Sequence, residues 1–403
     1  MMSEKQYPLA GLKVLDFSRV LAGPFAGRLL SDLGADVVKI EPPDGDITRL
    51  WGRVAGGLAG YYFQQNAGKR NVSMDLRAPG ARALALELAT KADVVIENYR
   101  PDVMPRLGLG YQDLSAVNPR LVMLSISGFG QGGPESHRPA YAPIVHAEVG
   151  LHERAARRSG LPHRELPLSV ADTNASLHGL VGLLAALLLR ERTGVGQHID
   201  IAMLDATVAT DDQLQFDIDG GAGGGGGAAG GPLPPTVWES GAGPILISGD
   251  FRYLWRLFTG KLGVVEPATP DMDLPTKIAA RHAAANAFIR SLKTWDEIEA
   301  TFARINVAWG RVRPASTVRE QPTLAHRGAF VEIDDRAGAT RTVAQSPYRY
   351  SNARSGVRGP ASHRGEHNRI VLAEWLGKSD TEIAALADAG ILTRDVEASE
   401  AAG

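Results

Sequence analysis

The 403-residue chain contains no cysteine. Disulfides, thiolate metal ligands and cysteine nucleophiles are therefore excluded, and any covalent catalysis must use another side chain. An excess of one charge is also missing, because 43 Lys and Arg residues face 45 Asp and Glu residues and leave a formal net charge of −2. A nucleic-acid-binding protein needs a basic face. We therefore expect no nucleic-acid partner.

Long hydrophobic runs are also few. The N-terminal residues, MMSEKQYPLAG, are charged and lack the apolar core of a signal peptide, which predicts a cytoplasmic protein. The most apolar run, Leu177–Leu189, is too short to cross a bilayer and contains His178. We therefore expect no membrane partner.

Two familiar motifs are missing or interrupted. The strand–turn–helix pattern of Phe17–Gly27 lacks G-x-G-x-x-G, which argues against a nicotinamide cofactor even though Glu41 lies where a ribose-binding acid would. The segment HRGEH (His363–His367) has the letters of the H-x-x-E-H zinc pattern, but Gly365 interrupts the helix that this pattern needs. We interpret the match as chance and expect no metal.

What the first 130 residues do contain is an alternation of strand-like and helix-like stretches. Such alternation predicts an α/β fold with a doubly wound, Rossmann-like parallel sheet and right-handed crossovers. Ligands of such sheets bind beyond the carboxyl ends of the strands. The predicted strands are Leu12–Phe17, Asp36–Glu41, Asn71–Leu76, Asp93–Tyr99 and Leu121–Phe129.

A low-complexity stretch divides the chain. Residues 219–235 are mostly Gly, Ala and Pro, and cannot hold a packed element. We therefore predict a large, discontinuous domain (1–205 and 322–403), a Gly-rich linker (206–235) and a small domain (236–321). The run Gly223–Gly227 is either a flexible linker or a mobile lid whose backbone can approach a reacting centre.

One acid precedes a strongly apolar helix. In VADTNASLHGLVGLLAALL, Asp172 is followed by several turns of Leu, Ala, Val and Gly. Asp is a favoured N-cap, so helix capping explains such a residue. Basic residues are placed more suggestively, because Arg19, Arg77, Arg100 and Arg106 fall at or just after predicted strand ends. Surface solvation explains any one of them, but together they could bind a phosphorylated ligand.

Four blocks of the sequence are distinctive together and in this order: GLKVLDFSRVLAGPFAGRLLSDLGADVVKIEPPDGD, NAGKRNVSMDL, ADVVIENYRP and RTGVGQHIDIAMLDA. They resemble the family III CoA-transferases, the relatives of formyl-CoA transferase, carnitine CoA-transferase and α-methylacyl-CoA racemase. The resemblance covers about residues 8–210 and resumes at SPYRYS and GEHNRIVLAEWLG in the tail.

The resemblance implies that Asp172 is the nucleophile. A carboxylate would attack an acyl-CoA thioester, form a mixed anhydride and release CoA thiolate, which returns to make an aspartyl-CoA thioester. The resemblance also implies an interlocked homodimer of chains with a large and a small domain. Coenzyme A or acyl-CoA is then a substrate, and a free carboxylic acid is the acceptor.

The resemblance implies CoA contacts by position. They are Arg19, Val20, Leu21, Ala22, Met74, Arg77, Asn98, Tyr99, Arg100, Arg106 and Arg138. The chain departs from formyl-CoA transferase at Pro42, where that enzyme has a basic contact, and at Leu21, where it has a glutamine. These departures argue against formyl/oxalate specificity. Gly223–Gly227 lies where some transferases carry a glycine loop that closes over the aspartate.

Two alternatives to CoA transfer stay open. A 2-methylacyl-CoA racemase would need acid/base residues on both faces of the α-carbon, and the racemases' His position corresponds to Tyr141 here. A phenol is a poor base at neutral pH. Tyr141 is therefore expected to assist transfer rather than racemisation. A non-catalytic acyl-CoA-binding protein would keep the arginines and have no need of Asp172.

Overall fold

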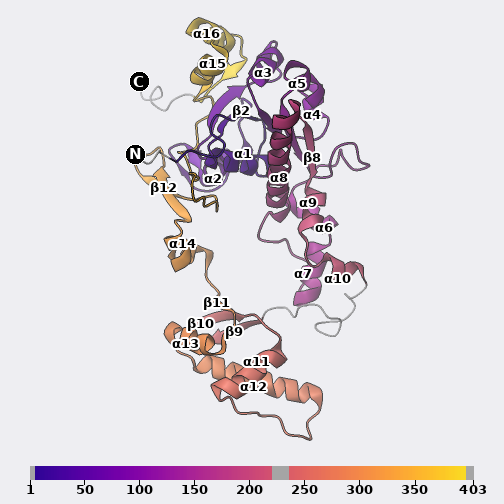
Figure 1. Cartoon of the computed structure of the whole chain (residues 1–403), viewed down its shortest axis with the longest axis vertical. Helices are drawn as coiled ribbons and strands as arrows, with labels where there is room; N and C mark the ends of the chain where they lie inside the picture. The colour runs from indigo at the N-terminus through magenta and orange to yellow at the C-terminus, as the bar shows by residue number, and fades with distance from the viewer. Residues whose placement is uncertain (1–4, 220–235, 396–403) are drawn as a thin grey trace. The chain divides into compact units, whose positions relative to one another are not determined.

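The computed structural model describes residues 5–219 and 236–395 (Figure 1). The chain forms two compact units, one of Met1–Asp212 with Thr323–Gly403 and the other of Gln213–Pro322. Each is described by itself.

A seven-stranded sheet forms the centre of the larger unit, in the order β14-β5-β2-β1-β6-β7-β8. Its strands are β1 (Lys13–Asp16), β2 (Asp36–Glu41), β5 (Arg70–Met74), β6 (Val94–Glu97), β7 (Val122–Ser127), β8 (His198–Ala202) and β14 (Leu392–Thr393). All neighbouring strands are parallel except β14, which is antiparallel to β5. The predicted parallel sheet is confirmed. The short antiparallel edge was not expected.

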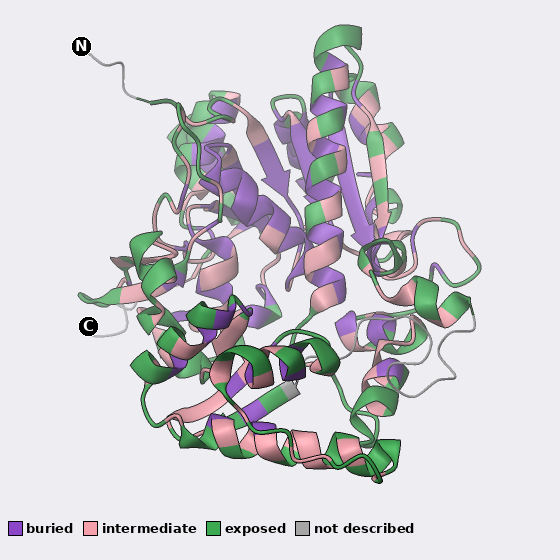
Figure 2. Cartoon of the chain, turned by 60° about the horizontal axis from the view of Figure 1, so that its bottom comes forward, coloured by how far each residue is buried: buried purple, intermediate pink, exposed green. Residues whose placement is uncertain are grey.

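The five strands β1, β2, β5, β6 and β7 are almost entirely buried, and Figure 2 shows buried strands in purple, whereas the edge strand β8 is partly exposed. Adjacent residues therefore enter different cores: Val14 joins one apolar cluster and Leu15 the other. Helices α3 (Ala81–Ala89), α5 (Tyr111–Val117), α15 (Asn368–Leu376) and α16 (Asp380–Asp388) contribute to the cluster of Leu15. Helices α1 (Ala22–Asp32), α6 (Ala142–Glu148), α8 (Val170–Thr193) and α9 (Met203–Thr210) contribute to the cluster of Val14.

The long helix α8 is buried along one face only. Ala175, Gly179 and Leu183 recur every four residues and are buried. A Cβ on Gly179 would lie 3.1 Å from the Leu124 side chain, so glycine lets α8 approach β7 closely. Helix α8 is long and apolar enough to cross a membrane, but buried core helices can have the same length and composition. Its buried face packs on the sheet.

The C-terminal segment returns to the larger unit. Strands β12 (Phe330–Asp334) and β13 (Thr340–Ala344) form a hairpin. Val343 of this hairpin packs with Tyr62 and Phe63 of α2 (Gly60–Asn66). The remaining elements of this unit are η1 (Ile47–Leu50), β3 (Val54–Ala55), β4 (Leu58–Ala59), α4 (Val103–Arg106) and α7 (Leu151–Ser159).

The smaller unit has its own core. An antiparallel sheet of β9 (Thr236–Ser240), β10 (Gly243–Ile247) and β11 (Trp309–Arg311) packs with α11 (Phe251–Leu262), α12 (Leu274–Ser291) and α13 (Trp295–Ile305). Trp238, Phe258 and Phe302 are nearly fully buried in it. Three short helices complete the described chain: α10 (Leu214–Ile218), η3 (Ala315–Glu320) and α14 (Pro322–His326).

Candidate functional site

A cavity of about 410 Å³ lies where β1, β6 and β7 end. These strands are neighbours in the sheet, so the loops that follow them meet at one edge. The loop after β1 contributes Arg19, the loop after β6 contributes Asn98, and the segment after β7 contributes Arg138. Asp172 lines the same cavity from α8.

Asp172 is not the N-cap of α8. Ser169 occupies that position, and Asp172 is the third residue of the helix. Its carboxyl group is therefore part of the first turn, where the helix dipole favours negative charge. The residue is only 8% exposed.

Burial raises the pKa of Asp172 to about 6, although the backbone amides of Ala22, Ala142 and Asp172 itself act in the opposite direction. Ala22 is the first residue of α1, and Ala142 is the first residue of α6. The starts of three helices thus direct N–H groups to one carboxylate. A carboxylate with a pKa of about 6 is still mostly ionised at neutral pH.

His146 fixes the start of α8. Its Nε2 atom accepts the backbone N–H of Ala171 at 3.1 Å, and the imidazole is 1% exposed. Burial lowers the pKa of His146, which keeps the ring neutral and able to accept this bond. The contact joins α6 to the residue before Asp172.

The loop after β1 has a strained backbone. Val20 has a φ of +68°, which is costly for a β-branched residue. Asn98 holds the loop from both sides: its Oδ1 accepts the Arg19 N–H and its Nδ2 donates to the Arg19 carbonyl, both at 2.8 Å. The Val20 N–H donates to the Asp46 carboxylate at 3.2 Å. These three hydrogen bonds hold the backbone at Val20 in a conformation that is unfavourable for valine.

A buried ion pair between Lys39 and Asp46 also holds this loop in place. Lys39 of β2 donates to the Ser18 carbonyl at 2.7 Å and lies 3.1 Å from the Asp46 carboxylate. Both side chains are at most 1% exposed. Burial opposes ionisation of Asp46, but the Lys39 charge and the Thr48 N–H hold its pKa at about 2. Sequence reasoning missed this pair, although a lysine inside the apolar strand DVVKIE is an unusual signal.

A second buried lysine fixes the start of α1. Lys69 donates to the Asp16 carboxylate at 2.7 Å and to the Pro24 carbonyl at 2.8 Å. Burial lowers the pKa of Lys69 to about 8, although Asp16 opposes this change. A Cβ on Gly27 would meet Asp16 at 2.6 Å, so glycine allows α1 to lie over the pair. The two lysines together position the loop and helix that face Asp172.

The structure places nine of the thirteen predicted site residues around this cavity. They are Arg19, Val20, Ala22, Asn98, Tyr99, Arg100, Arg138, Tyr141 and Asp172. Tyr141 is the N-cap of α6 and is 64% exposed. Arg138 pairs with Glu135 at 2.5 Å and Glu148 at 2.7 Å.

The other four predicted contacts lie outside the cavity lining. Met74 is fully buried in the core, and Leu21 is 7% exposed. Arg77 pairs with Asp75 at 3.0 Å, and Arg106 pairs with Asp102 at 3.3 Å. Both arginine side chains are largely exposed.

Three further features singled out in the sequence are the glycine run, the HRGEH segment and Glu41. The run Gly223–Gly227 lies outside the described residues. The segment His363–His367 precedes α15 rather than lying on it, and Gly365 has a φ of +71°. Glu41 accepts from Arg49 at 2.6 Å and from the Asp46 N–H at 2.6 Å, so it is a structural acid.

Tyr61 was missed by the sequence analysis. It lies on α2, outside any element that we predicted. Burial and the Asp172 charge raise the pKa of Tyr61 to about 12. The apolar residue Ile47 of η1 also lines the cavity.

Comparison with known proteins identifies close relatives. A family model described as CoA-transferase family III matches residues 9–368. A succinate–glutarate CoA-transferase of Agrobacterium fabrum is 33% identical over 392 residues, covering 93% of this chain and 97% of that protein. An acetyl-CoA:oxalate CoA-transferase of Acetobacter aceti is 45% identical over 203 residues, covering 50% of this chain and 52% of that protein.

A solved structure agrees with these relatives. A CAIB/BAIF family protein from Brucella suis has a TM-score of 0.77 and 31% sequence identity, covering 92% of this chain and 100% of that one.

The buried pair of Lys39 and Asp46 predicts a large stability effect. Asp46→Asn leaves Lys39 buried without its counter-charge and should lower the free energy of unfolding by about 3–5 kcal/mol, measured by urea denaturation. Asp44→Asn is the matched control, because the Asp44 side chain is 76% exposed and lies 3.9 Å from Arg19. That control should change stability by about 0.5 kcal/mol or less. Equal effects of the two substitutions would contradict the role of the pair.

The pKa of Asp172 predicts a stability gain on its neutralisation. Its folded pKa of about 6 exceeds the ordinary 3.8, so the folded state holds the proton more tightly and loses stability as pH rises between these values. At pH 8 this cost is about 3 kcal/mol. Asp172→Asn should therefore be more stable than the wild type at pH 8 and differ little from it near pH 4. A difference independent of pH would contradict this electrostatic origin.

Proposed function

Because this chain belongs to CoA-transferase family III, we propose that it moves CoA from an acyl-CoA to a free carboxylic acid with Asp172 as the nucleophile. The observation that carries the proposal is a nearly buried, ionisable carboxylate at a cavity bordered by arginines. A family III CoA-transferase without cysteine must form its covalent intermediates on another group.

The proposed reaction begins at the thioester carbonyl. A carboxylate oxygen of Asp172 attacks the acyl carbon, the C–S bond breaks and CoA leaves as a thiolate, which forms an acyl-aspartyl mixed anhydride. The thiolate then attacks the aspartyl carbonyl, releases the donor acid as a carboxylate and forms an aspartyl-CoA thioester.

The second half repeats these steps with the acceptor. The acceptor carboxylate attacks the aspartyl carbonyl and displaces CoA thiolate, which forms a new anhydride. The thiolate attacks the acceptor's acyl carbon, yields the new acyl-CoA and regenerates the Asp172 carboxylate. No net proton or redox change occurs.

The backbone around Asp172 supports this chemistry. Amides of Ala22 and Ala142 favour negative charge at the carboxylate. The same donors can stabilise the oxyanions that form when either carbonyl of the anhydride is attacked. They belong to helix starts held by buried contacts, so they require little reorganisation during the reaction.

We assign CoA binding to the larger unit, with 1–205 and 322–403 as the CoA-binding domain, 206–235 as the linker and 236–321 as the small domain. Arg19 and Arg100 line the cavity, and Val20, Ala22, Asn98, Tyr99 and Arg138 border it. Arg77 and Arg106 are exposed, are paired with Asp75 and Asp102, and are assigned to outer phosphates of the nucleotide. Leu21 and Met74 would act by supporting the loops, because their side chains are buried.

We also propose a homodimer in the cytoplasm. The outer face of α8 exposes Leu177, Val181 and Leu188, which are 44%, 68% and 69% exposed. Contiguous exposed apolar side chains of this kind suit a protein interface. The relatives named above act on succinate and glutarate or on acetyl-CoA and oxalate, and we infer a small carboxylic acid as the acceptor here.

The racemase alternative is weaker because it needs a base at the α-carbon. Tyr141 is the residue at the corresponding position, and a phenol is a poor base at neutral pH. A non-catalytic acyl-CoA-binding protein would have no reason to bury a carboxylate whose ionisation costs folding free energy. Transfer uses both Asp172 and the arginines.

The arginines predict a graded loss of CoA affinity. Arg19→Gln and Arg100→Gln should each weaken CoA binding by about ten-fold or more at low salt, because each removes a charge-assisted bond to phosphate. Arg77→Gln and Arg106→Gln should weaken it less. The matched control is Arg120→Gln, an exposed arginine paired with Glu191 and outside the cavity lining. If both cavity variants bind CoA normally in titration calorimetry, CoA does not bind at this cavity and the assignment is wrong.

Isotope exchange separates transfer from racemisation. With a 2-methylacyl-CoA in D₂O and no acceptor, a transferase should incorporate no deuterium at the α-carbon, because only the carbonyl carbon is attacked. Labelled free acid should instead exchange into its own CoA thioester. Tyr141→Phe should slow this exchange if the hydroxyl orients the carbonyl, and should leave CoA binding intact. Rapid deuterium uptake without acid exchange would favour the racemase.

A further inference from the structure

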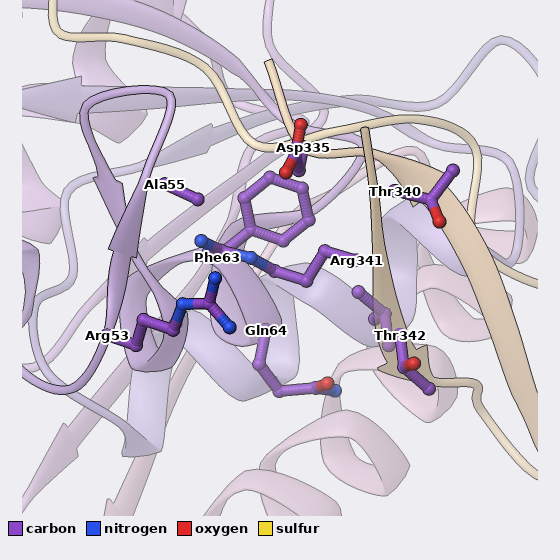
Figure 3. A pocket seen from close by; sticks show the side chains of 10 residues that line it. Arg53, Ala55, Phe63, Gln64, Asp335, Thr340, Arg341 and Thr342 are labelled. Carbon is purple, nitrogen blue, oxygen red and sulfur yellow. The ribbon is translucent and has the colours of Figure 1, made fainter. Parts of the chain in front are cut away.

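A second cavity lies in the larger unit and shares no lining residue with the cavity of Asp172. Its volume is about 400 Å³. Residues of the β3–β4 hairpin, α2 and the β12–β13 hairpin line it (Figure 3). Segments far apart in the sequence therefore build one concave surface.

Arg341 of β13 contributes its side chain to the lining of this cavity. Its Nη2 donates to the Leu58 carbonyl at 3.1 Å, and its guanidinium lies 4.6 Å from the centre of the Phe63 ring. Its Nη1 is buried and, within the described part of the chain, has no hydrogen-bond partner. A buried charged donor is costly to leave unsatisfied. The Leu58 carbonyl and the Phe63 ring thus hold the Arg341 side chain in place at the cavity.

Arg53 brings a second positive charge to the same cavity. It is exposed, and across residues 5–219 and 236–395 its side chain forms no ion pair or hydrogen bond. In Figure 3 the guanidinium groups of Arg53 and Arg341 point toward the same part of the cavity. Like charges repel unless an anion lies between them.

Asp335 does not fill this role completely. Its Oδ1 accepts the backbone N–H groups of Ala337 at 2.8 Å and Ala339 at 3.0 Å, so it closes the turn of the β12–β13 hairpin. These amides, and then Arg341 and Arg53, lower the pKa of Asp335. One acid facing two arginines leaves the cavity with excess positive charge.

We propose that this cavity binds a small oxyanion, a carboxylate or a phosphate group, through Arg53 and Arg341. Guanidinium groups match the two oxygens of such anions with parallel hydrogen bonds. The site is separate from the proposed chemistry at Asp172.

Titration calorimetry tests the proposal on the full chain in a chloride buffer free of carboxylate and phosphate. Succinate and inorganic phosphate are titrated separately, and at least one should bind. Arg53→Gln and Arg341→Gln should each weaken that binding about ten-fold. The control is Arg120→Gln, an exposed arginine paired with Glu191 and outside both cavities, which should leave that binding unchanged. Binding of succinate alone identifies a carboxylate site, and binding of phosphate alone identifies a phosphate site.

Three results would overturn the proposal. They are the absence of binding by both probes, equal weakening by Arg120→Gln, and unchanged binding by Arg53→Gln. Arg53 makes no side-chain bond within the described chain, so its variant tests the site even if Arg341→Gln fails to fold. If Arg53→Gln changes the oligomeric state of the protein, measured by sedimentation, the cavity would instead be assigned to a contact with a second copy of the chain.

Discussion

The convergence of three helix starts on one carboxylate is the constraint on which the site depends. Asp172 is nearly buried, and burial disfavours its charge. Amides of Ala22 and Ala142 offset part of this cost, so the group stays largely ionised at neutral pH while it remains more basic than an exposed aspartate. A desolvated but ionised carboxylate is suited to act as a nucleophile, and its donors are already placed for an oxyanion.

The loop after β1 and the start of α1, which carries the Ala22 amide, are held in place by charged side chains that do not line the cavity. Lys39 and Asp46 support the strained backbone at Val20, and Lys69 with Asp16 fixes the start of α1. Buried pairs of this kind contribute little net stability compared with apolar packing, but their removal one partner at a time is costly. Their value here is geometric, because they hold the loop that presents Arg19 and the first turn of α1.

The sequence predicted the parallel sheet because its strands are apolar runs separated by helices at short, regular intervals. It did not predict α2 or the pair of Lys39 and Asp46, since contacts between residues distant in sequence leave no local pattern. Asp172 was identified through family resemblance, and periodicity alone would have assigned it to helix capping, whereas Ser169 is the N-cap. Position in a motif also does not reveal burial: the structure places the Met74 side chain in the core, so any contribution of Met74 to CoA binding is through the loop it supports.

The central claim is that Asp172 becomes covalently attached to the acyl group and then to CoA. Trapping tests it directly: wild-type protein is incubated with an acyl-CoA donor and no acceptor, treated with hydroxylamine and digested for mass spectrometry. The account predicts a hydroxamate on the peptide that contains Asp172, and none in Asp172→Asn. Sustained CoA transfer by Asp172→Asn, or a hydroxamate on a different residue, would contradict it.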